Sequence, residues 1–313
     1  MMANERMVYL NGELVPDSQA KISIHDLGFL MGDAVFDTTR TFGGVIFKLQ
    51  QHLERFYRSL VYMRIDPGLS QAEMADCTMQ VLQANLPLIG EQEDYWITQR
   101  VTRGVRVYDD PGTSLTPTVL IECQPLPFAA RAKFYRDGLP VIVPSVRRTP
   151  PECMSPRAKV HNYINLIQGD LEVKAQNPEA WAILLDINGN IAEGLGSNFF
   201  IVKDGGLITP REQYVLGGIS RETVMDLARD LGIEAKEADI DLFDVYTAEE
   251  AFVTSTSFCI CPVSSINGAT IGDGTIPGPV TNQLLSAYSE LVGLNIVAQY
   301  LAHLQPTVGV STS

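Results

Sequence analysis

The sequence predicts an α+β protein of two domains, and three features of the chain favour this fold class. Short runs typical of strands and longer runs with helical periodicity occur in both halves of the 313 residues. They do not follow each other in the regular strand–helix–strand order of a doubly wound parallel sheet. A segment at 124–137 carries two prolines and little periodicity, as a linker would. We therefore expect a smaller domain over 1–123, a linker over 124–137 and a larger domain over 138–313.

The first half of the chain carries patterns for a hairpin, two helices and two strands. Asn11-Gly12 supplies the positive φ angles of a tight turn, and apolar residues from Leu53 to Leu60 repeat at i, i+3, i+4 and i+7. Ser70 is suited to cap a second helix. We expect a hairpin at 8–15, helices at about 50–63 and 70–85, and strands at 95–102 and 116–123, these two flanking a loop that contains Arg103, Gly104, Arg106 and 109–111.

In the second half, strand-like runs alternate irregularly with two helical segments. Asn188-Gly189 and residues 204–206 are turn signals between strands. The second helical segment ends at Gly232. We expect strands at 139–146, 182–186, 198–202 and 251–254, and helices at about 160–175 and 221–231, the latter burying Val224, Leu227, Ala228 and Leu231.

Composition restricts the class of partner. The chain has 37 acidic and 23 basic side chains, a formal net charge of −14 and a pI near 4.7. This excess of negative charge repels nucleic-acid phosphates and anionic lipid, so neither is an expected partner. No stretch approaches the ~20 apolar residues that a membrane-spanning helix needs. We expect a soluble cytoplasmic protein that acts on small molecules.

The five cysteines and four histidines favour neither a disulfide framework nor a metal site. The cysteines are odd in number and scattered. Cys259 and Cys261 form the only close pair, and no second pair or nearby histidine lies at metal-ligand spacing. We expect buried strand thiols at both positions and no metal.

Two glycines and a serine directly precede the helix expected at 221–231. Free backbone N–H groups at a helix start can bind an anion, and Gly217 and Gly218 would allow close approach because glycine has no side chain. Ser220 would cap the helix. The same pattern also serves as an ordinary helix start, so this feature alone leaves both interpretations open.

Two ionisable side chains lie in places that favour chemistry. Lys159 follows a proline-containing loop at the start of the apolar helix at 160–175, where it could point into a cleft. The neutral amine of a partly desolvated lysine can condense with an aldehyde. Glu193 lies between a strand and a glycine-rich turn, where it could hold a proton on a heterocyclic nitrogen. A surface lysine and an ordinary loop carboxylate are the alternatives.

A run of hydroxyl side chains, 254–257, follows the strand expected at 251–254. These groups could bind a phosphate or simply end the strand. A nucleophilic lysine, a carboxylate for a ring nitrogen, a helix-terminal anion site and a hydroxyl turn are together what a pyridoxal phosphate site needs. We therefore expect pyridoxal 5′-phosphate as the cofactor.

Motifs in the same order along nearly the whole chain, from about residue 8 to 290, resemble the class IV aminotransferases, the pyridoxal phosphate enzymes of fold type IV. Residues 26–37 are similar to the N-terminal signature of that family, and 52–56 to the segment whose arginine holds the cofactor phosphate. The resemblance implies a two-domain fold like that of D-amino-acid aminotransferase, and a homodimer. The family includes branched-chain amino-acid aminotransferase, D-amino-acid aminotransferase, (R)-selective amine transaminases and aminodeoxychorismate lyase.

The resemblance also implies roles for single residues. Lys159 matches the lysine that bonds to the cofactor aldehyde and then moves a proton, and Glu193 matches the partner of the pyridine nitrogen. Tyr163 falls near the position of the tyrosine that contacts the ring hydroxyl. The remaining expected cofactor-binding residues, at the phosphate, are Arg55, Ile219, Ser220 and Thr256.

For the substrate, the resemblance leaves several alternatives open. Arg40 lies where branched-chain enzymes carry an arginine, but Met31 replaces the tyrosine expected in them. Arg106 and Tyr108 are similar to the arginine and histidine with which D-amino-acid enzymes hold a carboxylate, although a solvated loop arginine is equally compatible. The expected substrate-binding residues are Phe36, Arg40, Arg106, Tyr108 and Ser257.

These features marginally favour a transaminase for D-amino acids or (R)-amines, with a 2-oxo acid as the acceptor. A branched-chain L-amino-acid aminotransferase with 2-oxoglutarate is the alternative, and aminodeoxychorismate lyase is a further one. The three types differ mainly in which pocket receives the substrate carboxylate.

Overall fold

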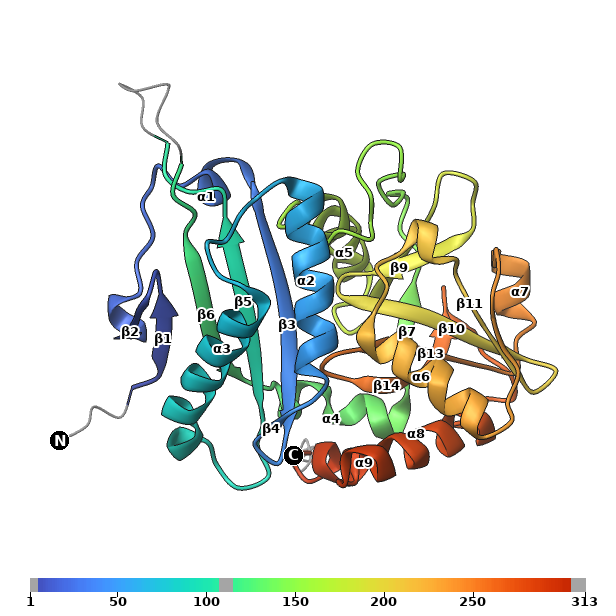
Figure 1. Cartoon of the computed structure of the whole chain (residues 1–313). Coiled ribbons are helices and arrows are strands. Elements are labelled where there is room, and N and C mark those ends of the chain that lie inside the picture. The colour runs from blue at the N-terminus through green and yellow to red at the C-terminus, as the bar shows by residue number, and fades with distance from the viewer. Residues whose placement is uncertain (1–4, 107–114, 305–313) are drawn as a thin grey trace, which may run out of the picture.

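The computed structural model of the chain describes residues 5–106 and 115–304. They form two β-sheets, one from each half of the chain, with helices packed around them (Figure 1). Helices and strands are mixed in both halves without regular alternation, so the predicted α+β class is confirmed. The domain limits stay a prediction.

The first half forms a six-stranded sheet in the order β2-β1-β6-β5-β3-β4. β1 and β2 are the hairpin predicted at 8–15, with Asn11 and Gly12 at positive φ. The strands are β1 (Met7–Leu10), β2 (Glu13–Pro16), β3 (Ala34–Phe42), β4 (Val45–Ile46), β5 (Tyr95–Thr102) and β6 (Val119–Pro125). β5 coincides with its predicted range, whereas β6 begins and ends later than expected.

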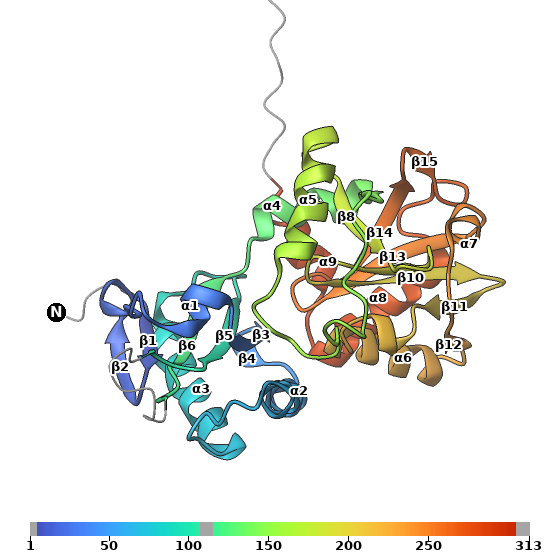
Figure 2. The same cartoon turned by 90° about the horizontal axis from the view of Figure 1, so that it is seen from above.

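Helices α2 (Leu49–Met63) and α3 (Gln71–Asn85) cover one face of this sheet, and the short α1 (Leu27–Met31) lies at its end (Figures 1 and 2). α2 buries Leu53, Phe56 and Leu60 against that face, as its spacing predicts. α3 begins with the predicted Ser70 cap, which forms a reciprocal capping box with Glu73. Both helices therefore form where the sequence places them.

The second half forms a nine-stranded sheet in the order β12-β11-β10-β13-β14-β7-β8-β9, with β15 beside β14. Because β9 also pairs with β10, part of this sheet closes on itself around a large apolar core. The strands are β7 (Leu139–Ile142), β8 (Trp181–Leu185), β9 (Ile191–Gly194), β10 (Ser197–Lys203), β11 (Gly206–Thr209), β12 (Ala235–Glu237), β13 (Glu250–Ser255), β14 (Cys259–Ile266) and β15 (Ala269–Thr270). Cys259 and Cys261 are buried thiols of β14, as predicted.

Six helices from the described part of the chain pack against this second sheet. They are α4 (Phe128–Asp137), α5 (Ile164–Gln176), α6 (Ile219–Asp230), α7 (Leu242–Tyr246), α8 (Pro279–Val292) and α9 (Ile296–Leu301). Figure 2 shows α6 and α8 on one side of it and α5 on the other. The start of α6 and the loop before α5 thus approach β3 and α2 of the first half, where the candidate site lies.

The segment at 124–137, the predicted linker, contains a strand end and a helix that the sequence patterns did not predict. β6 continues to Pro125, and α4 begins after Pro127. Phe128, Ala132 and Tyr135 are buried at i, i+4 and i+7, a helical spacing that the two prolines obscured. The segment therefore packs a helix against the core of the second half.

Three further expectations at helix ends are wrong. α5 begins at Ile164 and not near residue 160, because Val160 pairs as an isolated β-bridge with Val35. Gly218 is the N-cap of α6, so Ser220 lies inside the first turn and does not cap the helix. Leu231 follows the last turn of α6 and is 37% exposed. The expected strand at 139–146 also ends early, at Ile142.

Within the described ranges, no helix is both long enough and apolar enough to cross a bilayer. The same residues contain no group of three or more His, Cys, Asp or Glu side chains that could hold a metal ion.

Candidate active site

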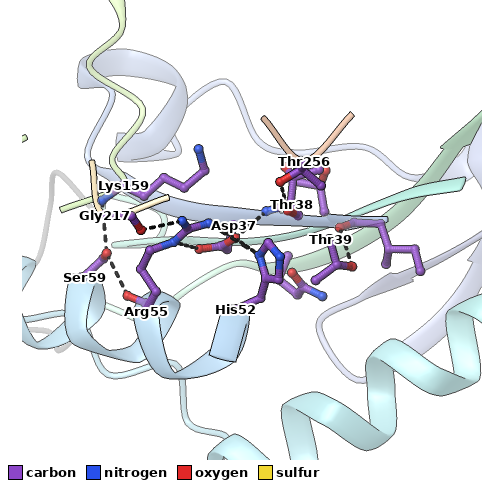
Figure 3. Close-up of polar contacts among 12 residues, drawn as sticks. Asp37, Thr38, Thr39, His52, Arg55, Ser59, Lys159, Gly217 and Thr256 are labelled. Carbon is purple, nitrogen blue, oxygen red and sulfur yellow. Dashed lines mark hydrogen bonds and ion pairs between the residues drawn. The ribbon is translucent and has the colours of Figure 1, made fainter. Parts of the chain in front are cut away.

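Lys159 is held at the edge of β3 by its own backbone. Its N–H donates to the Ser59 hydroxyl at 3.0 Å, and its carbonyl accepts from the Phe36 N–H at 3.1 Å. The amine lies 3.3 Å from the Tyr163 hydroxyl and 4.5 Å from the centre of the Phe36 ring. Figure 3 shows the side chain extending away from Ser59 and Arg55. The backbone is thus fixed by the first half of the chain, while the amine remains available for chemistry.

A single cavity collects the predicted cofactor-binding residues. It lies between the first half of the chain, which contributes Arg55, and the second half, which contributes the rest. The predicted residues that line it are Arg55, Lys159, Tyr163, Glu193, Ile219, Ser220 and Thr256. Residues up to 201 positions apart in the sequence, Arg55 and Thr256, therefore meet around one space.

Glu193, on β9, lines this cavity, and we call its surroundings the ring end. Its Oε1 accepts a hydrogen bond from the Arg148 Nε at 2.9 Å, and its Oε2 accepts from the Leu216 N–H at 2.9 Å. Leu216 is itself fixed, because its carbonyl accepts from the Asn198 side-chain amide at 2.9 Å. Glu193 is 5% exposed. A buried carboxylate with these donors suits a partner that carries a proton on a ring nitrogen.

The guanidinium of Arg55, held by a buried carboxylate, also lines the cavity, and we call its surroundings the phosphate end. Arg55 donates to Asp37 through Nε at 2.8 Å and Nη2 at 2.7 Å, and its Nη1 donates to the Gly217 carbonyl at 2.9 Å. His52 lies 2.8 Å from the same carboxylate (Figure 3). Burial alone would raise the pKa of Asp37, but Arg55 and His52 outweigh it and hold that pKa well below its usual range. Burial lowers the pKa of His52 despite Asp37.

The backbone beside Arg55 is shaped for an anion. Ile219 and Ser220 form the first turn of α6, where N–H groups have no helical partner. A Cβ at Gly218 would lie 2.1 Å from the Asn198 Oδ1, so only glycine fits there. Thr256 faces the same space and donates to the Thr38 carbonyl at 3.2 Å. An arginine, a helix start and a hydroxyl turn together fit a phosphate group.

The predicted substrate-binding residues lie in different surroundings. Phe36 packs edge-on against the rings of Tyr163 and His161, next to the Lys159 amine. Ser257 is buried beyond the hydroxyl turn, 3.2 Å from the Ser255 hydroxyl. These two residues therefore lie close to residues of the cavity.

Arg40 is 2% exposed, and protein groups surround its guanidinium. Nε donates to the Thr41 carbonyl at 3.0 Å, Nη1 to the Ser257 carbonyl at 2.9 Å, and Nη2 lies 3.6 Å from the Asp94 carboxylate. Arg40 is not among the residues that line the cofactor cavity. Its contacts position the turn that carries Ser257.

The two remaining predicted residues, Arg106 and Tyr108, follow β5 in the sequence. The Arg106 N–H donates to the His25 carbonyl at 3.0 Å. Tyr108 lies outside the described residues. Their predicted joint contact with a carboxylate therefore stays a prediction.

Several residues that complete the site were not among the predicted site residues. Asp37, His52 and Ser59 hold the groups that line the cavity, and Arg148 holds Glu193. Asp37 lies within the segment 26–37 that is similar to the family's N-terminal signature, and Asp37 is a buried charge on a strand face that it shares with Val35, Thr39 and Thr41. The partner of Glu193 lies 45 residues away, and local patterns do not show such pairs.

Known proteins that are similar to this chain are aminotransferases. The family described as "Amino-transferase class IV" matches residues 34–266. A putative branched-chain-amino-acid aminotransferase of Methanocaldococcus jannaschii is 37% identical over 91% of this chain and 96% of its own length. A D-alanine aminotransferase of Bacillus licheniformis is 29% identical over 90% of this chain and 95% of its own length.

Solved structures of branched-chain aminotransferases are also similar to this chain. The branched-chain aminotransferase of Escherichia coli superposes with a TM-score of 0.83 and 28% identity, over 97% of this chain and 98% of that one. The T.th. branched-chain aminotransferase, complexed with N-(5′-phosphopyridoxyl)-L-glutamate, gives 0.81 and 27% identity over 92% and 95%. The cavity residues fit the ring nitrogen and the phosphate of such a cofactor. The chain belongs to the class IV aminotransferases of fold type IV, which use pyridoxal 5′-phosphate.

Proposed function

We propose that this aminotransferase takes the amino group from branched-chain L-amino acids and passes it to a 2-oxo acid. The observation that carries this proposal is the aromatic wall beside the Lys159 amine, formed by Phe36 and Tyr163. Such a wall suits an apolar side chain on the reacting carbon. The relative from M. jannaschii, named a putative branched-chain-amino-acid aminotransferase, supports it.

The bound cofactor supplies an aldehyde that bonds to amines and a ring that stores electrons during proton transfer. Lys159 is placed to move a proton from the substrate carbon, because its amine is next to the substrate wall and its backbone is fixed. Glu193 keeps a proton on the ring nitrogen, and Arg148 keeps Glu193 in place. Arg55 and the start of α6 hold the phosphate.

A second candidate donor is a D-amino acid or an (R)-amine, the type that the sequence marginally favours. The strand end at Arg103-Gly104 and the nearby Arg106 support it, since a guanidinium beyond β5 could bind a carboxylate bidentately. The D-alanine aminotransferase of B. licheniformis is similar over nearly its whole length. The two candidates place the substrate carboxylate in different pockets.

A panel of donors tests the proposal. The purified, cofactor-loaded protein is incubated with a 2-oxo acid acceptor and with L-leucine, D-alanine or (R)-1-phenylethylamine, and the keto product is measured. We expect product from L-leucine at a rate at least about tenfold above the other two. Product from D-alanine alone would establish the second candidate. Cleavage of aminodeoxychorismate without any transamination would replace both.

We also propose a homodimer. Residues 22–31 expose an apolar surface on and before α1, with Ile24 70%, Phe29 65% and Met31 58% exposed. Apolar patches of this kind mark protein interfaces. Sizing chromatography should give about twice the mass of one chain, and Phe29→Glu should shift it to a monomer; a wild-type monomer contradicts this proposal.

A further inference from the structure

The face of the first sheet that points away from α2 forms a wall next to Lys159. Side chains alternate along β3, so Val35 and Asp37 face α2 while Phe36, Thr38 and Arg40 lie on the opposite face. On β5 the paired residues of that face are Arg100, Thr98 and Trp96, respectively. The 3.1 Å contact between the Thr38 and Thr98 hydroxyls confirms the shared face.

Two guanidinium groups on this wall already have carboxylate partners. Arg100 donates to Glu122 at 2.9 Å, at the end of the wall next to Phe36 and Lys159. Arg40 pairs with Asp94 at the other end. Neither is therefore the best candidate for binding an added anion.

Arg131, on α4, differs from both. Its guanidinium carbon lies 4.9 Å from the centre of the Trp96 ring and 4.6 Å from that of Phe258. It donates to the Ser257 hydroxyl. No carboxylate of the residues described in the structure lies within ion-pair distance of it.

Burial of the Arg131 guanidinium charge costs free energy. Arg131 is half-buried beside the rings of Trp96, Trp181 and Phe258, and burial lowers its pKa. Tyr300, Tyr135 and Cys261 raise the pKa of Arg131, whereas the charge of Arg40 lowers it further. A half-buried guanidinium without a counter-ion is stabilised when an anion binds beside it. Arg131 therefore fits an anionic part of a ligand.

Arg131 is connected to the cofactor cavity through the hydroxyl turn. Ser257, which accepts from Arg131, lies 3.2 Å from the hydroxyl of Ser255, and Ser255 and Thr256 line the cavity. Trp181, on the other side of Arg131, donates to the Ser197 hydroxyl at 3.1 Å, and Ser197 also lines the cavity. Arg131 and Ser257 do not themselves line the cavity, so an anion at Arg131 would belong to a molecule that occupies the cavity and extends past the hydroxyl turn.

The position of Arg131 along the wall decides which carboxylate it could meet. Lys159 lies against Phe36, whereas Arg131 lies over Trp96, whose partner in the register is Arg40. Phe36 and Arg40 are four residue steps apart, which corresponds to about 13 Å along β3. A carboxylate on the reacting carbon stays near Lys159, so only a carboxylate further along the substrate extends toward Arg131.

We propose that Arg131 binds the carboxylate remote from the reacting carbon in a dicarboxylic substrate, a 2-oxo dicarboxylic acid or its amino acid. This inference rests on the proposed aminotransferase function, and it names the residue that selects a dicarboxylic acceptor. Arg131 is a specificity residue here and takes no part in proton transfer.

Two acceptors of equal length test this assignment, since 2-oxoglutarate and 2-oxopentanoate differ only in the remote carboxylate. Each is reacted with the holoenzyme in its aminated form, and kcat and KM are measured. For Arg131→Met we expect kcat/KM for 2-oxoglutarate to fall about 30-fold, mainly through KM, and that for 2-oxopentanoate to change less than about threefold. Arg136→Met is the matched control, because Arg136 lies on the exposed side of the same helix. It should behave like the wild type.

Several outcomes would overturn the assignment. An equal loss with both acceptors means that Arg131 is only structural, and no loss means that it does not meet the substrate. A preference of the wild-type enzyme for 2-oxopentanoate would also refute the assignment of Arg131, but it would leave the proposed aminotransferase function unaffected. Absence of reaction with every acceptor removes the proposed function itself.

A binding measurement on the wild type keeps the assignment testable if Arg131→Met does not fold. Glutarate and pentanoate are compared as inhibitors competing with the acceptor. We expect glutarate to inhibit at about a tenfold lower concentration, and Arg131→Lys to reduce this difference, because lysine lacks the bidentate fork. Equal inhibition by the two acids would refute the assignment.

Discussion

The two ends of the cofactor cavity use the same pair of side-chain types in exchanged positions. At one end the carboxylate of Glu193 lines the cavity, and Arg148 holds it from behind at 2.9 Å. At the other end the guanidinium of Arg55 lines the cavity, and Asp37 holds it from behind through bonds of 2.7 and 2.8 Å. The sign of the lining charge is therefore reversed between the ends.

This reversal matches the cofactor, which has a protonated ring nitrogen at one end and a phosphate at the other. In each case the group behind has the opposite charge, so no lining charge is buried without a partner. The difference lies in what each end does. With the proposed roles, the ring end would control proton transfer and electron flow during the reaction, whereas the phosphate end would only anchor the cofactor. Changes at the two ends should therefore affect different measurable quantities.

Lys159→Ala should have the largest effect, because this residue lies between the two ends and belongs to neither pair. Loss of its amine removes both the attachment point and the proton carrier, so transamination should fall by more than about 10³-fold. The unfolding midpoint should change little, because the backbone contacts to Ser59 and Phe36 remain. Borohydride reduction of the holoenzyme should fix the cofactor on the wild-type chain and not on the variant. Full activity in the variant would contradict the role.

Glu193→Gln changes the ring end and should lower the rate of the chemical step. Glutamine keeps the size of the side chain but cannot stabilise a protonated ring nitrogen, so kcat should fall about 10²-fold or more. Affinity for the cofactor should change much less, since the phosphate end is intact. Glu237→Gln is the control, because Glu237 also pairs with a buried arginine, Arg221 at 2.8 Å, away from the cavity. Wild-type rates in Glu193→Gln would mean that another group holds the ring nitrogen.

Asp37→Asn should affect affinity at the phosphate end. Asparagine cannot accept both bonds from Arg55 as a carboxylate does, so the guanidinium loses its fixed orientation. Outer partners of binding groups typically contribute about 10- to 100-fold in affinity, and we expect a cofactor Kd raised by that factor. At saturating cofactor, kcat should stay within about threefold of wild type. Asp17→Asn, in the exposed pair with Arg6, is the control. A lowered kcat with unchanged Kd would contradict the division between the two ends.

The lining residues could be predicted from the sequence far better than the residues behind them. Lys159 and Glu193 lie in local motifs of loop, glycine and strand, and the start of α6 follows from its two glycines. Asp37 and Arg148 act through partners 18 and 45 residues away, and local periodicity does not report such distances. Arg131 could not be predicted from the sequence for a different reason. It lies in the segment expected to be a linker, where two prolines obscured the buried spacing of α4.

The histidines near the cavity extend the comparison to pH. His52 lies in the phosphate-end pair, and His161 lies on the substrate side, where its ring packs edge-on against Phe36 and its Nε2 is 3.3 Å from Arg100. Burial and then Arg100 lower the pKa of His161 to about 4. Burial lowers the pKa of His52 as well. Both rings are therefore neutral beside arginines at neutral pH.

His161→Gln should reduce the acid sensitivity of the fold. Between the ordinary pKa of about 6.5 and the folded value of about 4, the unfolded chain binds more protons at this histidine than the folded chain does. Stability is therefore lost as pH falls through this window, by up to about 3 kcal/mol for one such group. Urea unfolding at pH 7.5 and pH 4.5 should show a smaller loss in the variant. The loss that remains comes from His52 and from other titrating groups. Identical losses in both proteins would mean that His161 does not contribute to the acid sensitivity.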